Sequence, residues 1–321
     1  MRRRKRPGLP AAMVLAGLAI GCGGAGRAPA PQSAAGPSSV DLGDFDDVGD
    51  QVREFMDAED MMLTQGDYGG FATLMAPEAF WFGASASQAR SGRLAVMEAL
   101  RAAYPPAADG TAGFSFRTPF ESVGVAPDGE SAWVAEEMPA TVAEGGATRE
   151  IPYRVTSFVA KVGERWLVLA QHWSVGTAEP GTAAPSPAGI RERVGPGAGE
   201  LVDALASALQ SPAAFEAAIS ARADVQILVV EAIGNAEGGE AAKVLVRERF
   251  GDGGATFGIA GDVDAALAPS GSAGYVAANL DATSVVDGVR VTRPMRGLFV
   301  WLREGDAWRI VQAHLSEGLA D

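Results

Sequence analysis

Apolar residues recur along the chain in two patterns, first at helical spacing and then in short extended runs. A period near 3.6 predicts amphipathic helices that pack on a core. The positions with this period are Val52, Phe55, Met56, Met62 and Leu63, followed by Leu94, Met97, Leu100 and Tyr104. Later runs at 114–125, 131–142, 151–162 and 166–175 have strand character and are separated by short turns. The pattern predicts helices followed by a four-stranded antiparallel meander.

The second half of the chain repeats this pattern. With a shift of 142 positions, 126–176 lies over 268–318 without a gap, and 15 of the 51 pairs are identical. A weaker match at a shift of 147 places Gly92 over Gly239. The helical stripe of the second copy is Leu201, Val202, Leu205 and Leu209. We therefore predict two tandem α+β units, each with helices on one face of a curved antiparallel sheet.

The N-terminus has the pattern of a targeting segment. Residues 1–21 hold a basic start and an apolar run that is too short to span a bilayer. Residues 18–22 resemble a bacterial lipoprotein signal, which implies acyl chains on Cys22 that anchor the protein to a membrane. The alternative is an ordinary signal peptide with an incidental cysteine. Either reading predicts export, and the first predicts a lipoprotein of the cell envelope that faces the periplasm or the exterior.

Composition shifts divide the rest of the chain. Residues 22–45 are rich in Gly, Ala, Pro and Ser, which predicts a flexible tether. A first domain is expected at 46–176 and a second at 198–318. Four prolines between them mark 177–197 as a linker.

Charge and composition exclude several classes of function. The formal net charge is −14, although the first six residues alone carry five cations, so the body of the chain is more acidic still. Such a body repels phosphate backbones, and we expect no nucleic-acid partner. The chain has one cysteine and two histidines, which leaves few ligands for a metal. We expect neither a metal nor another cofactor.

Several short motifs resemble the SnoaL-like family of the nuclear transport factor 2-like superfamily. In the first copy they are Phe80-Trp81-Phe82-Gly83, Ser91-Gly92-Arg93, Arg154-Val155-Thr156, Trp166 and His172-Trp173-Ser174. In the second they are Gly239, Arg296, Trp308, His314 and Ser316, with Leu298 in place of the threonine. The resemblance implies cone-shaped α+β barrels. It also implies a choice of functions, because the superfamily includes isomerases, dehydratases, polyketide cyclases and non-catalytic binding modules.

The two histidines are the sharpest candidates for a site. His172 and His314 fall at equivalent places near the end of each final strand, and alternation places Trp166, Val168, Ala170, His172 and Ser174 on one face. A three-residue hairpin loop at 163–165 pairs Arg154 with Ser174, whereas a two-residue loop puts Arg154 on the other face. We favour the first because it gathers the repeated polar residues.

These residues suggest a pocket for a small hydrophobic carboxylate or carbonyl compound. The predicted ligand-binding residues are Arg154, His172, Ser174 and Trp133, and their counterparts Arg296, His314, Ser316 and Tyr275. The alternative is that the polar residues satisfy only buried backbone and one another.

Catalysis has weaker support. Glu136 and Glu137 are candidates for an acid and a base, but Ala278 and Asn279 replace them in the second copy, and a solvated strand face explains them more simply. We therefore expect an anchored lipoprotein that binds a small molecule or a partner without catalysis, with its two domains paired through their sheets. The alternative is an isomerase, dehydratase or cyclase-like enzyme that acts in the first domain only.

Overall fold

The computed structural model describes residues 47–105, 114–116, 118, 120–144, 147–176, 189–230, 235–251, 255–286 and 288–318. They belong to one compact unit. The predicted signal peptide, Cys22 and the tether lie outside the described residues. Among the residues described, no helix has the length and apolar character needed to cross a membrane. Below, residues 47–176 are called the first half and residues 189–318 the second half.

The first half begins with helices, as its apolar period predicts. Helix α1 (Val48–Thr64) starts at Asp47, whose side chain accepts a hydrogen bond from the Gly49 amide, and α2 (Tyr68–Leu74) is capped by Asp67 in the same way. Helix α3 (Arg93–Ala103) follows Gly92, which has a φ of 93° that disfavours other residues. The α1 stripe is buried, but in α3 Leu94 is 64% exposed, so only part of that predicted stripe reaches the core.

The first sheet has seven strands. They are β1 (Met75–Phe82), β2 (Ala89–Ser91), β3 (Phe114–Phe116), β4 (Phe120–Val125), β5 (Ser131–Glu144), β6 (Ala147–Val162) and β7 (Arg165–Val175). Their order is β2-β1-β7-β6-β5-β3, with β4 also paired to β5. Strand β1 runs parallel to β7, with Phe82 beside His172. The sheet is therefore mixed and open, whereas the resemblance implied a cone-shaped barrel with an antiparallel sheet. Strand β1 runs parallel to β7, and the strands at the two ends of the sheet do not pair with each other.

The second half follows the same order of elements. Its helices are α4 (Gly199–Ala208), α5 (Pro212–Ala218) and α6 (Gly239–Phe250). Its strands are β8 (Arg193–Val194), β9 (Gln226–Leu228), β10 (Asn235–Glu237), β11 (Thr256–Leu267), β12 (Ala273–Val286), β13 (Val289–Glu304) and β14 (Ala307–Ser316). The order β10-β9-β14-β13-β12-β11-β8 repeats that of the first sheet, with β8 added at the edge.

Two details of the predicted repeat need correction. The counterpart of Gly92 is Gly238, not Gly239, because Gly238 precedes α6 with a φ of 90°. Part of the predicted linker belongs to the second sheet, since Arg193 and Val194 pair in parallel with β11. Residues 177–188 of the predicted linker lie outside the described residues.

A β-bulge in β7 changes the predicted faces of that strand. The hairpin loop has two residues, since Val162 pairs with Arg165, but the register shifts between Phe158 and Val159. Arg154 therefore still pairs with Ser174, as the three-residue loop predicted. The extra residue turns Trp166 and Val168 toward the helices, so they do not share a face with His172.

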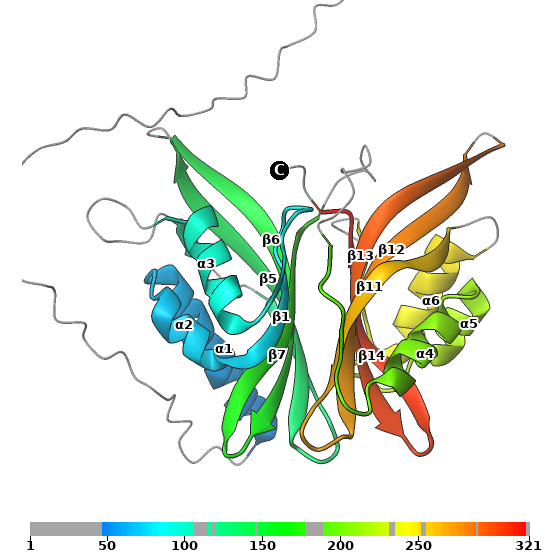
Figure 1. Ribbon diagram of the computed structural model, residues 1–321, viewed down its shortest axis with the longest axis horizontal. Coiled ribbons are helices and arrows are strands. Elements are labelled where there is room, and N and C mark those ends of the chain that lie inside the picture. The colour runs from blue at the N-terminus through cyan, green and yellow to red at the C-terminus, as the bar shows by residue number, and fades with distance from the viewer. Residues whose placement is uncertain are drawn as a thin grey trace, which may run out of the picture. The chain divides into compact units, whose positions relative to one another are not determined.

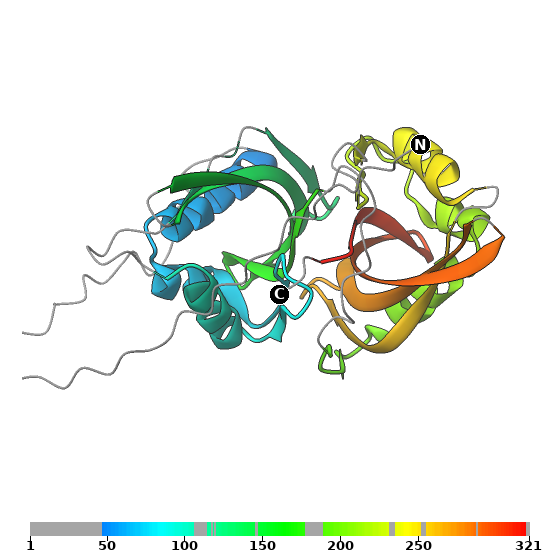
Figure 2. The ribbon, with the colours of Figure 1, turned by 90° about the horizontal axis from the view of Figure 1, so that it is seen from above.

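Three apolar cores hold the described chain together. One lies between the first sheet and α1–α3, and the second lies between the second sheet and α4–α6. The third joins the helix-free faces of the two sheets and includes Phe82, Trp133 and Phe158 of the first half and Tyr275 and Val300 of the second. Figure 1 shows the helices on the outer sides of the two sheets, and Figure 2 shows each sheet curving around its own helices.

Candidate functional site

The predicted site residues meet at the contact between the two sheets. The rings of His172 and His314 stack with centroids 4.0 Å apart and planes 19° apart. Both side chains are fully buried. Each imidazole reaches a hydroxyl of the other half: His172 Nε2 lies 2.8 Å from Ser316 Oγ, and His314 Nε2 lies 2.7 Å from Ser174 Oγ. The two histidines therefore join the halves.

Two buried arginines complete this arrangement. Arg154 Nη2 donates to Ser174 Oγ at 3.1 Å, and Arg296 Nε donates to Ser316 Oγ at 3.1 Å. Arg296 also reaches the first half, where it donates to the carbonyls of Gly83, Ala84 and Ser85. We call this set the polar clasp. It consists of Arg154, Thr156, His172, Ser174, Arg296, His314 and Ser316.

The direction of these hydrogen bonds assigns the protons. Each serine oxygen accepts from an arginine, so its hydroxyl is available to donate to the Nε2 atom of a histidine. Each histidine then carries its proton on Nδ1. His314 Nδ1 lies 3.0 Å from Thr156 Oγ1, whereas His172 Nδ1 has no hydrogen-bond partner among the described residues. His172 Nδ1 lacks a partner because Leu298, which has no hydroxyl, occupies the position equivalent to Thr156.

The surroundings of the clasp keep both histidines neutral. Burial is the main cause that lowers the pKa of His172 and of His314 well below the usual 6.5. The charges of Arg154 and Arg296 lower both pKa values further. An unfolded histidine binds a proton below about pH 6.5, so the clasp loses stability as the pH falls below that value.

Trp133 and Tyr275 also lie in the inter-sheet core. Trp133 Nε1 donates to the carbonyl of Asp224 at 2.8 Å, and the Tyr275 hydroxyl donates to Asp264 Oδ1 at 2.7 Å. The structure thus brings all eight predicted ligand-binding residues into one buried contact between the halves. Their hydrogen bonds are made within the chain, and their role in ligand binding stays a prediction.

A second polar group lies inside the first half, between α1 and the sheet. Its members, called the acid cluster below, are Glu59, Asp60, Glu121 and Glu136. Glu59 and Glu136 are buried, and each has an oxygen without a hydrogen-bond partner among the described residues. Burial, reinforced by the neighbouring charge of Asp60, raises the pKa of Glu59 to about 8, and burial raises the pKa of Glu136 well above its usual 4.5.

The solvated face expected for the two glutamates of β5 is wrong for Glu136. Alternation sends Glu137 outward, where it is exposed, and Glu136 inward beneath α1. Sequence reasoning missed Glu59 altogether. The available signal was its position, because Glu59 falls on the same helical stripe as Val52, Phe55 and Met62.

A chain of contacts links the acid cluster to a cleft at the end of β6. Gln171 Nε2 donates to Glu59 Oε1 at 2.8 Å, and Trp173 Nε1 donates to Gln171 Oε1 at 2.7 Å. The Trp173 ring contacts Tyr153, whose hydroxyl lies 2.5 Å from that of Tyr104.

The two tyrosines line an opening, called the mouth cleft below, with a volume of about 630 Å³. The other lining residues are Ala84, Ser85, Gln88, Ala103, Val142, Arg149, Glu150, Ile151, Pro152 and Val175.

The interior of the second half has lost this polarity. The repeat places Ala278 at the position of Glu136, Met295 at that of Tyr153, Ala313 at that of Gln171 and Leu315 at that of Trp173. All four are part of the apolar core beneath α4–α6. The two halves therefore share a contact surface but differ in their interiors.

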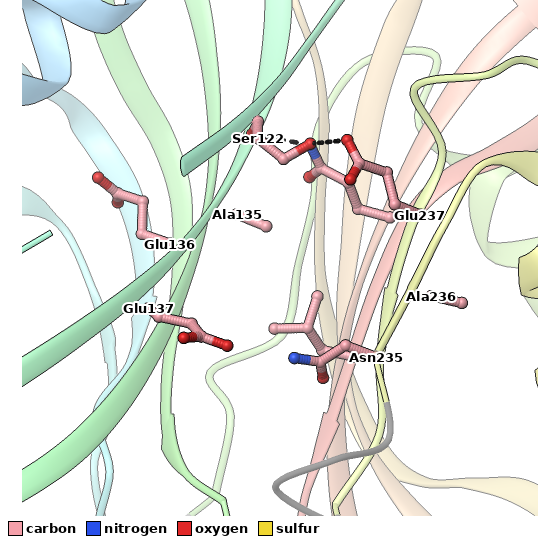
Figure 3. Close-up of a pocket in the computed structure, with 9 residues that line it drawn as sticks. Ser122, Ala135, Glu136, Glu137, Asn235, Ala236 and Glu237 are labelled. Carbon is pink, nitrogen blue, oxygen red and sulfur yellow. Dashed lines mark hydrogen bonds between the residues drawn. The ribbon is translucent and has the colours of Figure 1, made fainter. Parts of the chain in front are cut away.

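A third feature is a pocket of about 300 Å³ between the halves, called the inter-sheet pocket. Ser122, Ala135, Glu136 and Glu137 line it from β4 and β5, and Gln226, Leu228, Asn235, Ala236 and Glu237 line it from β9 and β10. In Figure 3 Glu137 and Asn235 face each other across the pocket, whereas Glu136 points away from it. Among the residues described, no group of three or more His, Cys, Asp or Glu side chains has the arrangement to hold a metal ion.

The clasp predicts a cost for removing one hydroxyl. Thr156→Val keeps the shape of the side chain but leaves the Nδ1 proton of His314 without an acceptor. We expect the free energy of unfolding to fall by about 1–3 kcal/mol, the usual cost of an unsatisfied buried donor. Urea titration measures it. Thr292→Val, at an exposed position, is the control and should change stability by less than about 0.5 kcal/mol. An equal effect of the two variants would contradict the assigned role of Thr156.

The raised pKa of Glu59 predicts that Glu59→Gln is more stable than the wild type by an amount that depends on pH. Between pH 4.5 and about 8 the folded protein holds this proton and the unfolded chain does not, so the stability of the wild type falls as the pH rises. Glu59→Gln has no titrating group at this position, so its stability does not fall for this reason. Its advantage should grow through this window by at most about 1.4 kcal/mol per pH unit. Denaturation at a series of pH values measures it, and the exposed Glu54→Gln on the same helix should show no such trend.

Comparison with known proteins supports the family assignment of the first half. Residues 52–178 match the family model described as a SnoaL-like domain. No curated protein sequence matches the chain significantly.

The chain is also similar to solved structures. A putative calcium/calmodulin-dependent protein kinase II association domain from Xanthomonas campestris has 19% identity, coverage of 39% of this chain and 86% of that chain, and a TM-score of 0.34. A putative scytalone dehydratase from Novosphingobium aromaticivorans has 15% identity, coverage of 44% and 93%, and a TM-score of 0.34. An NTF2-like protein from Pseudomonas putida has 16% identity, coverage of 46% and 96%, and a TM-score of 0.35. The predicted α+β class is confirmed, and the match to the SnoaL-like domain model covers residues 52–178.

Proposed function

We propose that this protein is a membrane-anchored lipoprotein of the cell envelope, with tandem SnoaL-like domains, that binds a small molecule in its first half. The observation that carries the proposal is the difference between the two interiors. A polar, aromatic interior opens on the mouth cleft in the first half, and the equivalent positions of the second half form an apolar core. Because a buried carboxyl oxygen without a hydrogen-bond partner is costly, a purely structural interior would not favour Glu59 and Glu136.

The mouth cleft suits the ligand class expected from the sequence. Its volume lies within the range of small-molecule sites, and its walls combine apolar groups with the hydroxyls of Tyr104 and Tyr153. Arg149 lines the same cleft, and its charge acts on Tyr153. A guanidinium beside apolar walls favours a hydrophobic carboxylate. Arg149 thus takes the role expected from the sequence for Arg154, which donates hydrogen bonds to Ser174, Asn235 and the Val230 carbonyl.

Calorimetric titration with 4-phenylbutyrate tests this binding. We expect saturable binding that Arg149→Gln weakens by about tenfold, because the variant removes a charge-assisted hydrogen bond. Arg290→Gln, an exposed change near the equivalent hairpin of the second half, should leave the affinity unchanged. Absence of binding, or equal weakening by both variants, would refute the assignment to the mouth cleft.

One observation favours a second candidate function, acid–base catalysis in the first half. A carboxyl with a pKa of about 8 holds its proton at neutral pH, which suits a general acid. Enolisation of a carbonyl compound needs an acid that donates a proton to the carbonyl oxygen and a base that takes the proton from the neighbouring carbon. Glu59 would be the acid, and Glu121, whose pKa of about 6 leaves it ionised at neutral pH, would be the base. The protein should then catalyse deuterium exchange at the carbon next to the carbonyl of 4-phenyl-2-butanone, followed by NMR. Exchange should stop in Glu59→Gln and continue in Glu54→Gln; no exchange above background in the wild type rejects this candidate.

A further inference from the structure

The inter-sheet pocket presents two carboxylates from opposite walls. Glu137 belongs to β5 of the first half and Glu237 to β10 of the second, and both are exposed. Ser122 Oγ donates to Glu237 Oε1 at 2.6 Å, which fixes one oxygen of that carboxylate at the edge of the pocket (Figure 3). No ion pair within the described part of the chain includes Glu137 or Glu237. The lining residues include no lysine and no arginine.

The chain itself shows what such a carboxylate binds, at the opposite edge of the same contact. There Ser91 Oγ of the first half donates to Asp264 Oδ2 of the second at 2.9 Å, which repeats the pairing of Ser122 with Glu237. The two edges correspond, because Ser122 and Asp264 lie 142 positions apart and occupy equivalent places in the repeat. Each edge thus joins a serine of the first half to a carboxylate of the second.

At the Asp264 edge a guanidinium fills the space beside the carboxylate. Arg193 Nη2 donates to Asp264 Oδ1 at 2.6 Å, and Arg193 Nε donates to Asp264 Oδ2 at 3.1 Å. Arg193 Nη1 also reaches Glu78 Oε2 at 3.1 Å, so one cation bridges carboxylates of both halves. This cation comes from β8, which pairs with β11 at that edge. Within the described residues the Glu237 edge has no equivalent strand, and a pocket lies there instead.

We propose that the inter-sheet pocket binds a small organic cation with a guanidinium or primary ammonium group, held between Glu137 and Glu237 as Arg193 is held between Glu78 and Asp264. The volume of about 300 Å³ is at the lower end of the range of ligand sites, so it fits a compact ligand. Carboxylates on facing walls attract a cation and repel the carboxylate ligand proposed for the mouth cleft. The other lining residues include the apolar Leu228 and Asn235, whose Oδ1 accepts a hydrogen bond from Arg154 Nη1 at 3.3 Å.

Isothermal titration of the full chain with butylguanidinium tests the site. Butylurea is the control ligand, since it has the same shape without the charge. Saturable binding of butylguanidinium, weakened by high salt, is expected, and no binding of butylurea. Butylamine distinguishes the two cation types: an equal affinity indicates recognition of charge alone, and a lower one indicates bidentate contacts to a guanidinium. Butylurea that binds as well as butylguanidinium would overturn the proposal.

Variants locate the binding. Glu137→Gln and Glu237→Gln should each weaken binding by about tenfold or more. Glu164→Gln, in the exposed β6–β7 turn, should leave it unchanged. Ala135→Leu keeps both carboxylates but fills space in the pocket, because the Ala135 side chain points toward it in Figure 3, and it should abolish binding. Unchanged affinity in both glutamate variants, with melting temperatures equal to that of the wild type, refutes the site.

Discussion

Each sheet carries helices on one face only, and the other face must be covered as well. The two sheets solve this by packing their helix-free faces together around aromatic residues such as Trp133, Phe158 and Tyr275. Polar groups within that contact have no access to water, so each needs a partner inside it. The polar clasp provides such partners across the contact, because the serine of each half forms a hydrogen bond with the histidine of the other half. The most visible repeated polar residues of the sequence are thus explained by the joining of the halves.

The same contact determines where ligands can bind. It uses the helix-free faces of both sheets, so the places left for a ligand are the interiors beneath the helices and the edges where the sheets diverge. In the first half the interior retains Glu59, Glu136 and Gln171, whereas the second half fills the equivalent space with apolar side chains. The second half therefore supports the first by covering its sheet. This division explains why a single interior carries the candidate chemistry.

Much of the fold follows from the sequence. The shift of 142 positions reproduces the starting residues of β5, β6 and β7 in β12, β13 and β14. The pairing of Arg154 with Ser174 was also predictable, but through two compensating errors, since a shorter loop is offset by a bulge. A bulge leaves little trace in an alternating apolar run, because residues on both faces of β7 are buried. The parallel pairing of β1 with β7 was not predictable, because it joins segments far apart in the sequence.

The candidate sites were harder to predict than the fold. His172 and His314 stood out because they are rare and repeated, yet repetition marks what the two halves share, and they share the contact. The residues that distinguish the first half are those that the repeat does not preserve. Glu59 lies in a helix with several other acidic residues, and only its place on the apolar stripe sets it apart. Positions at which the two copies differ therefore indicate the candidate sites better than positions at which the two copies are identical.

A tandem chain permits such differences where a homodimer does not. In a symmetric dimer the same patch meets itself, so each substitution appears at both sides of the contact. Here Thr156 lies within hydrogen-bond distance of His314 Nδ1, whereas Leu298, at the equivalent position, leaves His172 Nδ1 without a partner among the described residues. In the same way, Arg193 binds Asp264 at one edge of the contact, and a pocket lies at the other edge. In a homodimer each such substitution would lower the stability at two symmetric positions, whereas in a single chain it lowers the stability at one. Covalent linkage of the halves thus allows one interior to lose its polarity and one edge to stay open without loss of the shared contact.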